Sequence, residues 1–266
     1  MSTTISTPFP ATETRPTALP SMSTVFSALL RADLTTQWRN RRSSLMVFLI
    51  PVIILISWKG LIERVGGAFA LSNCITVGLT AIGLLGYANS VARDRDKGIF
   101  QRLRVAPASN WAIMASRLTV QLIMIAIMTI VTFIVGYKVD NISLPFSYYV
   151  LGFFAALISG AVYLSLGQLV VGLIRNPETV NATSRLIYIV FIMIGMFAQF
   201  GALDKLGKII GKITQYSPYG VVKTIVSGGL APTTWTTDTT MALIATLSYT
   251  AVFTFLGVRW FRWSTR

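Results

Sequence analysis

The chain has 266 residues, of which 53% are hydrophobic and only 12% charged, and its formal net charge is +14. A soluble domain usually contains about 25% charged residues. Half that share, together with several long uncharged runs, excludes an ordinary soluble, disordered or collagen-like protein and indicates a multi-span membrane protein.

The first part of the chain is polar. Residues 1–24 are rich in Ser, Thr and Pro, which predicts a disordered cytoplasmic tail that cannot bury a core. Residues 25–42 change character and are predicted to form an amphipathic helix on the membrane surface. Its apolar row at i, i+4 spacing is Phe26, Leu30, Leu34 and Trp38, while Arg31, Asp33 and Gln37 fall elsewhere. The alternative is a cytoplasmic extension of the first span.

Six apolar segments then predict an all-α membrane domain over residues 43–262. The predicted spans are residues 43–58, 65–92, 118–137, 148–174, 186–203 and 239–258. The first has 16 uncharged residues between Arg42 and Lys59. At about 1.5 Å per residue it reaches about 24 Å, short of a bilayer core of about 30 Å. We therefore expect it to borrow residues after Lys59 or to rely on snorkelling basic side chains.

The placement of Lys and Arg predicts the orientation. With the N terminus inside, the inner segments hold 16 basic residues and the outer segments hold 7. Such an excess predicts both termini on the cytoplasmic side. Basic residues at the ends of apolar runs also argue against a nucleic-acid partner, which would need a basic face on a soluble body.

Residues 93–117, between the second and third spans, form the most charged stretch and are predicted to be cytoplasmic. Ile99, Phe100 and Leu103 give a short helix an apolar edge, and Pro107 ends it. Such an edge suits docking into a groove of a partner. Contact with anionic lipid explains a basic loop equally well.

Residues 204–238 form a long outer segment. Leu203, Leu206, Ile210 and Ile213 repeat at a spacing of three to four. This pattern predicts a short amphipathic helix at the outer surface, or one that dips partly into the membrane. Residues 217–220 (SPYG) then predict a turn.

Polar side chains within the spans are candidates for a substrate path. They are Asn73, Thr76, Thr80, Asn89, Ser90, Gln121, Gln168 and Gln199. Met193, Met196, Phe197 and Phe200 offer an adaptable apolar wall. The alternative for the polar set is hydrogen bonding between helices, and for the apolar set plain contact with lipid or core.

Several residue types needed for catalysis or metal binding are missing from the sequence. There is no histidine, and the one cysteine, Cys74, lies inside an apolar run. The nearest approach to a phosphate-binding loop, residues 207–214, has the wrong glycine spacing and places Ile213 where a hydroxyl is needed. We therefore expect no ATP site, no metal site and no cofactor in this chain.

The charged loop resembles the cytoplasmic loop between the second and third spans of ABC-2 type transporter permeases. The resemblance rests on residues 94–98 (DRDKG) and 102–109 (RLRVAPAS). Three further stretches are similar to the family: the basic cluster before the span with Pro51, residues 167–177 (GQLVVGLIRNP) and residues 217–229 (SPYGVVKTIVSGG). The likeness covers about residues 25–262.

The resemblance implies a permease that pairs with a second copy or a sister chain, each copy docking one ABC ATP-binding subunit that holds ATP and Mg. It implies that the loop is a coupling helix, whose ATPase contacts would be Arg95, Lys97, Gly98, Phe100, Leu103, Arg104 and Pro107. It implies that spans two and five face a dimer cavity, with the substrate path at Asn73, Thr76, Thr80, Met193, Met196, Phe197, Gln199 and Phe200. It further implies outward movement of a drug-, antibiotic- or lipid-like substrate across a cell membrane, gated by rigid-body motion.

Two other functions stay open at this point. A membrane-embedded lipid-modifying enzyme would need a carboxylate pair, and Asp94 and Asp96 are the only candidates at the interface. Their i, i+2 spacing directs them to different sides of a helix. A membrane anchor that holds a cytoplasmic partner without transport is the second. The uncharged runs contain no acid, which argues against a proton- or sodium-coupled carrier.

Overall fold

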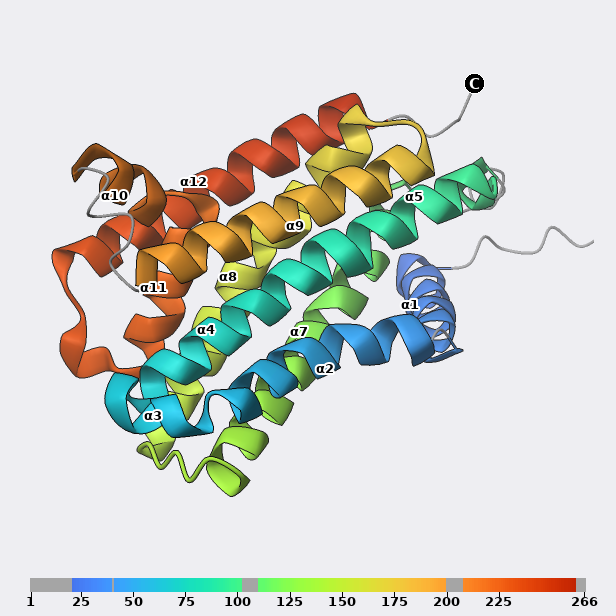
Figure 1. Ribbon diagram of the computed structural model, residues 1–266. Helices are drawn as coiled ribbons and strands as arrows, with labels where there is room; N and C mark the ends of the chain where they lie inside the picture. Colours follow the sequence, from blue (N-terminus) through green and yellow to red (C-terminus); the bar gives the residue numbers. More distant parts are fainter. Residues whose placement is uncertain (1–20, 40, 102–109, 200–207, 262–266) are drawn as a thin grey trace, which may run out of the picture.

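The computed structural model of the chain describes residues 21–39, 41–101, 110–199 and 208–261 (Figure 1). Within these ranges the secondary structure is helical, without any strand. The helices are α1 (Met22–Arg39), α2 (Arg41–Ser57), α3 (Lys59–Val65), α4 (Gly67–Thr80), η1 (Ala81–Ala88), α5 (Asn89–Asp96), α7 (Asn110–Lys138), α8 (Phe146–Leu173), α9 (Pro177–Gln199), α10 (Lys208–Gln215), α11 (Pro218–Leu230), η3 (Pro232–Thr234) and α12 (Thr237–Trp260). The predicted all-α class is therefore confirmed.

Four of the described helical segments are long and apolar enough to cross a membrane. They are Gly67–Asp96, Ala112–Lys138, Phe146–Leu173 and Thr237–Trp260. These four coincide with predicted spans two, three, four and six. The first predicted span corresponds to α2, which contains Pro51 and holds the shorter apolar helix Val47–Ser57. The fifth corresponds to α9, which begins at Pro177, earlier than the predicted residue 186.

The long helices run back and forth along one direction (Figure 1). Successive long elements alternate in direction along the chain. In order they are α2, the continuous rod of α4, η1 and α5, then α7, α8, α9 and α12. One end of the bundle therefore holds α1, Lys97 and Phe261, and it is named the α1 end. The opposite end holds α3, α10 and residues 139–145, and it is named the α10 end.

α8 lies at the centre of the bundle and packs against α4, η1, α7, α9, α11 and α12. Its neighbour η1 is a π-helix, a wider winding in which hydrogen bonds join residues five apart. A Cβ on Gly83 of η1 would lie 2.5 Å from the Tyr163 backbone, and one on Gly167 would collide with the Gly83 carbonyl oxygen. Glycine on both sides therefore lets the two backbones touch.

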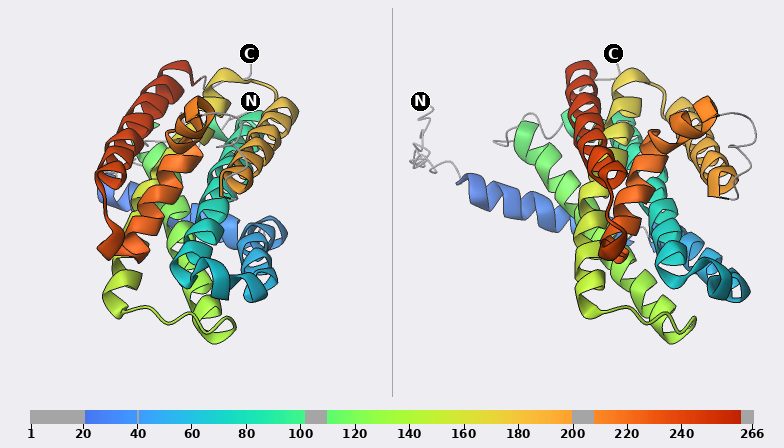
Figure 2. Two further views of the ribbon diagram at one scale, coloured as in Figure 1. Left: turned by 60° about the vertical axis from the view of Figure 1, so that its left-hand side comes forward. Right: turned by 90° about the vertical axis from the view of Figure 1, so that its left-hand side faces the viewer.

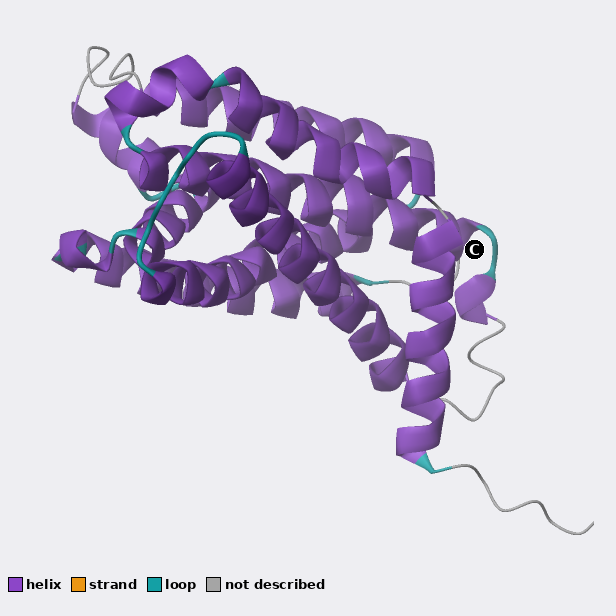
Figure 3. Cartoon of the chain, turned by 90° about the horizontal axis from the view of Figure 1, so that it is seen from below, coloured by secondary structure: helices purple, strands orange, loops and turns teal. Residues whose placement is uncertain are grey.

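α1 projects steeply from the bundle (Figures 2 and 3) and contacts α7. It covers the predicted amphipathic segment, but the packed face differs from the prediction. Phe26, Leu30 and Leu34 are half-buried, whereas Trp38 is 73% exposed. Asp33, predicted to lie off the apolar row, faces α7, because Ser116 supplies a hydrogen-bond partner there.

The segment before α12 enters the bundle instead of lying on its surface. The predicted turn at residues 217–220 is confirmed only at its start. Tyr216 and Ser217 form the turn between α10 and α11, whereas Pro218 to Gly220 belong to the first turn of α11, where the Gly220 amide donates to the Ser217 hydroxyl at 3.1 Å. α11 packs against α4, α8 and α12. The Tyr249 hydroxyl, midway along α12, donates to the Tyr216 carbonyl at 2.8 Å. Leu203 and Leu206 of the predicted apolar row lie outside the described residues.

Candidate functional site

The first candidate site is the base of the loop that follows α5, at the α1 end. α5 ends at Asp96, Lys97 and Gly98 form a turn, and a helical segment begins again at Ile99. The Gly98 amide donates to the Arg95 carbonyl at 3.1 Å. Gly98 has a φ of +67°, a left-handed conformation that other residues adopt only with strain. A glycine is therefore needed where the chain changes direction.

Arg95 fastens this loop base to α8. Its side chain is 2% exposed, and its guanidinium donates to the carbonyls of Val171 at 2.8 Å, Ile174 at 2.6 Å and Arg175 at 2.7 Å. The last carbonyls of a helix lack intrahelical partners and form the negative end of the helix dipole. Arg95 thus caps α8 from α5 and holds the two helices together.

Arg117 of α7 ties the loop base to two further elements. It donates to the Asp94 carboxylate at 2.6 Å, and its guanidinium lies over the Phe100 ring, 4.6 Å from the ring centroid. The Phe100 ring also meets Phe261 edge-on, with 5.7 Å between the centroids. Phe100 is fully buried, so α5, α7 and the residue after α12 converge on the start of the loop.

Asp33 extends this network to α1. Its carboxylate accepts a hydrogen bond from the Ser116 hydroxyl of α7. Burial raises the pKa of Asp33, and the Ser116 hydrogen bond and the nearby Arg117 charge oppose that rise only in part, while Asp94 adds to it. The docked position of α1 is therefore sensitive to the protonation of a single carboxyl group.

The structure places four of the seven predicted docking residues at this loop base. Lys97 is exposed and Gly98 makes the turn. Arg95 and Phe100 are buried within the chain, where they fasten the loop base to α8 and to Phe261. The other three, Leu103, Arg104 and Pro107, lie outside the described residues. Contact of these residues with an ATPase stays a prediction.

The polar candidates in α4 are bonded within their own helix. The Asn73 amide donates to the Phe69 carbonyl at 2.9 Å, Thr76 to Ser72 at 2.7 Å, and Thr80 to Thr76 at 2.7 Å. Such back-bonding satisfies a hydroxyl or amide group in apolar surroundings. Asn73, Thr76 and Thr80 are all buried, and none lines the two larger cavities described below.

Of the other polar candidates, one bonds within its own helix, one bonds to another helix, and two line a small cavity. Asn89 also bonds back within its own helix, whereas Gln168 of α8 accepts a hydrogen bond from the Tyr87 hydroxyl at 2.6 Å. This pair is an interhelical bond of the kind that the structural alternative predicts. Ser90 and Gln121 line a small cavity of about 30 Å³ beside Asp33.

The apolar candidates belong to the second half of α9. Met193 is exposed. Met196, Phe197 and Gln199 lie at the end of the helix, and their side chains are outside the described part of the structure, as is all of Phe200. Their place in a substrate path stays a prediction.

An apolar groove runs between α7, α8 and α12. It encloses about 410 Å³, and its lining includes Leu118, Leu122 and Thr250. The Tyr87–Gln168 pair also lines it. Gln168 was among the predicted polar candidates, but nothing in the sequence indicates this groove, because its walls come from four separate spans.

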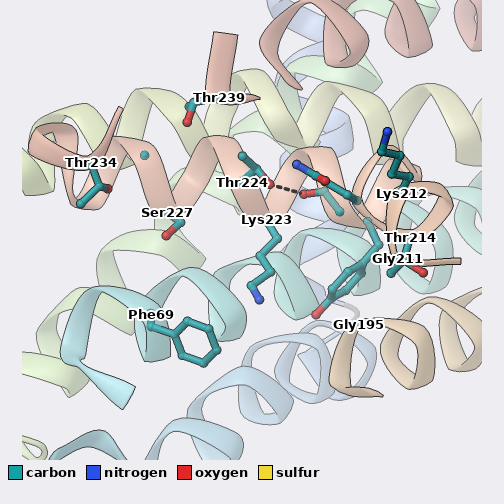
Figure 4. A pocket seen from close by; sticks show the side chains of 14 residues that line it. Phe69, Gly195, Gly211, Lys212, Thr214, Lys223, Thr224, Ser227, Thr234 and Thr239 are labelled. Atoms are coloured by element: carbon teal, nitrogen blue, oxygen red, sulfur yellow. Dashed lines mark hydrogen bonds between the residues drawn. The ribbon is translucent and has the colours of Figure 1, made fainter. Parts of the chain in front are cut away.

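A larger cavity of about 720 Å³ opens at the α10 end, and it is named the α10-end cavity (Figure 4). Its polar lining includes two lysines, the Gln215 amide, the Tyr219 hydroxyl and the hydroxyls of Ser and Thr residues. The lysines and the Ser and Thr residues are Lys212, Thr214, Thr224, Ser227, Thr234 and Thr239, with Lys223 at the side of α11. The elements around it are α4, α9, α10, α11 and α12.

Lys223 points from α11 toward α4 (Figure 4). Its Nζ lies 4.6 Å from the centroid of the Phe69 ring. Among the described residues no carboxylate pairs with it, and burial lowers its pKa to about 8. The sequence analysis counted Lys223 only as an outer basic residue. Its position inside the run Val221 to Val226 (VVKTIV) was the available signal.

Comparison with known protein families gives one finding. A family model described as ABC-2 type transporter matches residues 24–220, well over half of the chain. The match begins in α1 and ends in the first turn of α11, so it includes the whole loop base. A search of curated proteins found no match.

Proposed function

This chain belongs to the ABC-2 type transporter family, and we propose that it is the permease subunit of an exporter that moves a drug-, antibiotic- or lipid-like substrate outward across a cell membrane. The family consists of multi-pass membrane domains without an ATPase motif, so ATP is hydrolysed in a partner subunit. One observation carries the proposal: the loop base at Lys97 is fastened to α7, α8 and Phe261 at a single end of the bundle.

We place six spans in the membrane, with the α1 end in the cytoplasm. Support comes from the alternating directions of α2, the α4–η1–α5 rod, α7, α8, α9 and α12 (Figure 1). The excess of Lys and Arg in the segments at the α1 end supports the same orientation. This topology puts the loop base where a soluble ATPase can reach it.

The coupling helix would start at Ile99, after the turn at Lys97 and Gly98, and Lys97 is the exposed cation beside its start. A second permease copy or sister chain is needed so that two ATPase subunits can close on each other. The exposed apolar face of α9, with Leu186, Ile189 and Met193, offers a surface for that copy or for the substrate. The buried positions of Asn73, Thr76 and Thr80 mean that the α4 part of the path forms only when helices move apart.

Transport then follows from how the loop base is held. ATP closes the paired nucleotide-binding subunits, which is possible only if ATP binds the closed state more tightly than the open one. A displacement at Lys97 moves α5 and, through Arg95, the end of α8 as one rigid body. The same rod continues through η1 to Phe69 at the α10 end, so movement on one side of the membrane reaches the other.

Leu103→Asp tests the docking role. The new charge would enter an apolar groove of the ATPase, so co-purification of the partner should be lost while membrane insertion is kept. Ile213→Asp is the matched control, because it introduces the same charge at an exposed position of the α10 end. Unchanged partner capture by Leu103→Asp would refute the docking assignment.

Further observations distinguish the two alternative functions from that of an exporter. The lipid-modifying enzyme loses its carboxylate pair, because Asp94 is paired with Arg117 while Asp96 is exposed. A non-transporting anchor would also co-purify with an ATPase. Only the exporter shows substrate-stimulated ATP hydrolysis when the permease and its ATPase are reconstituted together in liposomes.

A further inference from the structure

The α10-end cavity contains a cation that the described part of the chain does not neutralise. Lys223 lies on the side of α11 that faces α4, and Ser227, one helical turn later, lies on the same side (Figure 4). Phe69 lies below both residues in this view, and its ring centroid is 4.6 Å from the Lys223 ammonium. The arrangement joins a positive charge, a hydroxyl and an aromatic wall in one accessible cavity.

We propose that the α10-end cavity binds an oxyanion, the phosphate or carboxylate of an anionic lipid or of a soluble anion, through the Lys223 ammonium with the Ser227 hydroxyl beside it. An ammonium and a hydroxyl are donors that charged oxygen atoms accept strongly. Six side chains with a hydroxyl group line the same cavity, which suits a ligand whose polar head carries several acceptors. This inference goes beyond transport and does not depend on it.

The Phe69 ring explains how Lys223 is held while the site is empty. A cation over an aromatic face gains about 0.5–2 kcal/mol, less than a partly desolvated ammonium gains from a charged acceptor. An arriving oxyanion therefore displaces the ring from the ammonium at a net gain. Burial lowers the pKa of Lys223, which is the direction expected for an ammonium that has no charged partner beside it.

Arg117 shows what a purely structural cation looks like in this protein. Arg117 also lies over an aromatic ring, that of Phe100, but it has the Asp94 carboxylate at 2.6 Å. Lys223 lies over the Phe69 ring, but it forms no ion pair with a carboxylate of the described residues. The difference between these two cations points to an external anion as the missing partner of Lys223.

Native mass spectrometry of the purified full-length chain tests the proposal. The probes are phosphatidylglycerol, zwitterionic phosphatidylcholine and inorganic phosphate. The wild type should retain phosphatidylglycerol in preference to phosphatidylcholine, and Lys223→Met should lower that retention about tenfold, as expected for the loss of a charge-assisted bond. Displacement of the lipid by inorganic phosphate assigns the site to soluble anions, and persistence of the lipid assigns it to a headgroup.

Three further variants keep the test decisive. Lys138→Met removes an exposed lysine of the α10 end that does not line the cavity and should leave retention unchanged. Lys223→Arg should preserve binding, which separates loss of charge from a folding defect. Phe69→Leu should keep or increase retention, because it removes the competing ring. Wild-type retention by Lys223→Met for both probes would overturn the proposal, as would a loss in Phe69→Leu equal to that in Lys223→Met.

Discussion

At the α1 end, Arg95 and Arg117 find their acceptors inside the chain: three backbone carbonyls for the first, and a carboxylate with an aromatic ring for the second. At the α10 end, Lys223 has an aromatic ring and a cavity, without a carboxylate from the described residues. Both ends place basic side chains in partly or fully buried positions, yet only at the α1 end do the described residues supply hydrogen-bond acceptors. They serve the terminal guanidinium nitrogens of Arg95 and Arg117, but not the buried Nε atoms.

This difference separates two uses of a buried charge. A cation whose bonds all lie within the chain is fixed in place, so it can transmit a displacement from one helix to the next. A cation without such bonds is costly unless something else supplies them. We therefore expect substitutions at the α1 end to affect folding and coupling, and substitutions at the α10 end to affect binding.

The largest expected effect is at Arg95. Arg95→Met leaves three carbonyls at the end of α8 without their donor, which should lower the free energy of unfolding by about 3 kcal/mol or more. SDS-driven unfolding in mixed micelles measures this loss. Arg93→Met is the control, because Arg93 is an exposed neighbour on the same helix. Equal stabilities of the two variants would contradict the capping role.

The next largest effect compares Arg117 and Lys223, the two cations that lie over aromatic rings. A double-mutant cycle of Asp94→Asn and Arg117→Met should give a coupling energy of about 1–2 kcal/mol in the same unfolding assay. The matching cycle of Lys223→Met and Phe69→Leu should give about 0.5 kcal/mol, as expected for a cation–π contact alone. A larger coupling at Lys223 than at Arg117 would reverse the comparison between the two ends.

The smallest effect concerns the pH dependence of α1. Burial raises the pKa of Asp33 above 3.8, so docked α1 binds a proton more tightly than free α1 does. The protonated Asp33 carboxyl group therefore stabilises the docking of α1. This stabilisation is complete when the pH is below the ordinary pKa of an aspartate, and it is lost as the pH rises through the raised pKa of Asp33. Spin labels at Ala28 and Leu122, with Cys74 replaced by Ser, should show closer approach in acid. Asp33→Asn should abolish the pH response.

The sequence predicts the helical scaffold well because long apolar runs leave few alternatives in a bilayer. The predicted span 65–92 corresponds to the rod Gly67–Asp96, and the predicted span 148–174 corresponds to α8. The predicted spans stop at charged residues, whereas the helices extend beyond them. α7 begins at Asn110, ahead of the predicted residue 118, since Arg117 finds a partner in Asp94 and fits inside the helix.

The site was predictable only in part. The charged loop motif singled out Arg95 and Phe100 as ATPase contacts, which stays a prediction, but a motif does not reveal which way a side chain points. Arg95 turns inward because the end of α8, distant in sequence, supplies carbonyl acceptors. Lys223 was counted only among the outer basic residues. Its place beside the cavity could not be predicted, because it depends on α11 entering the bundle.

The π-helix η1 gives the rod an unusual dependence on its residue count. Its wide winding sets the angle between the Thr76 side of α4 and the Arg95 side of α5. Deleting one residue from η1 would let its winding tighten into an α-helix, which has fewer residues per turn. The span would keep its apolar character, and the tighter winding would offset most of the rotation that the deletion imposes on Arg95. The wide turn therefore gives the rod a spare residue at the point where it packs against α8.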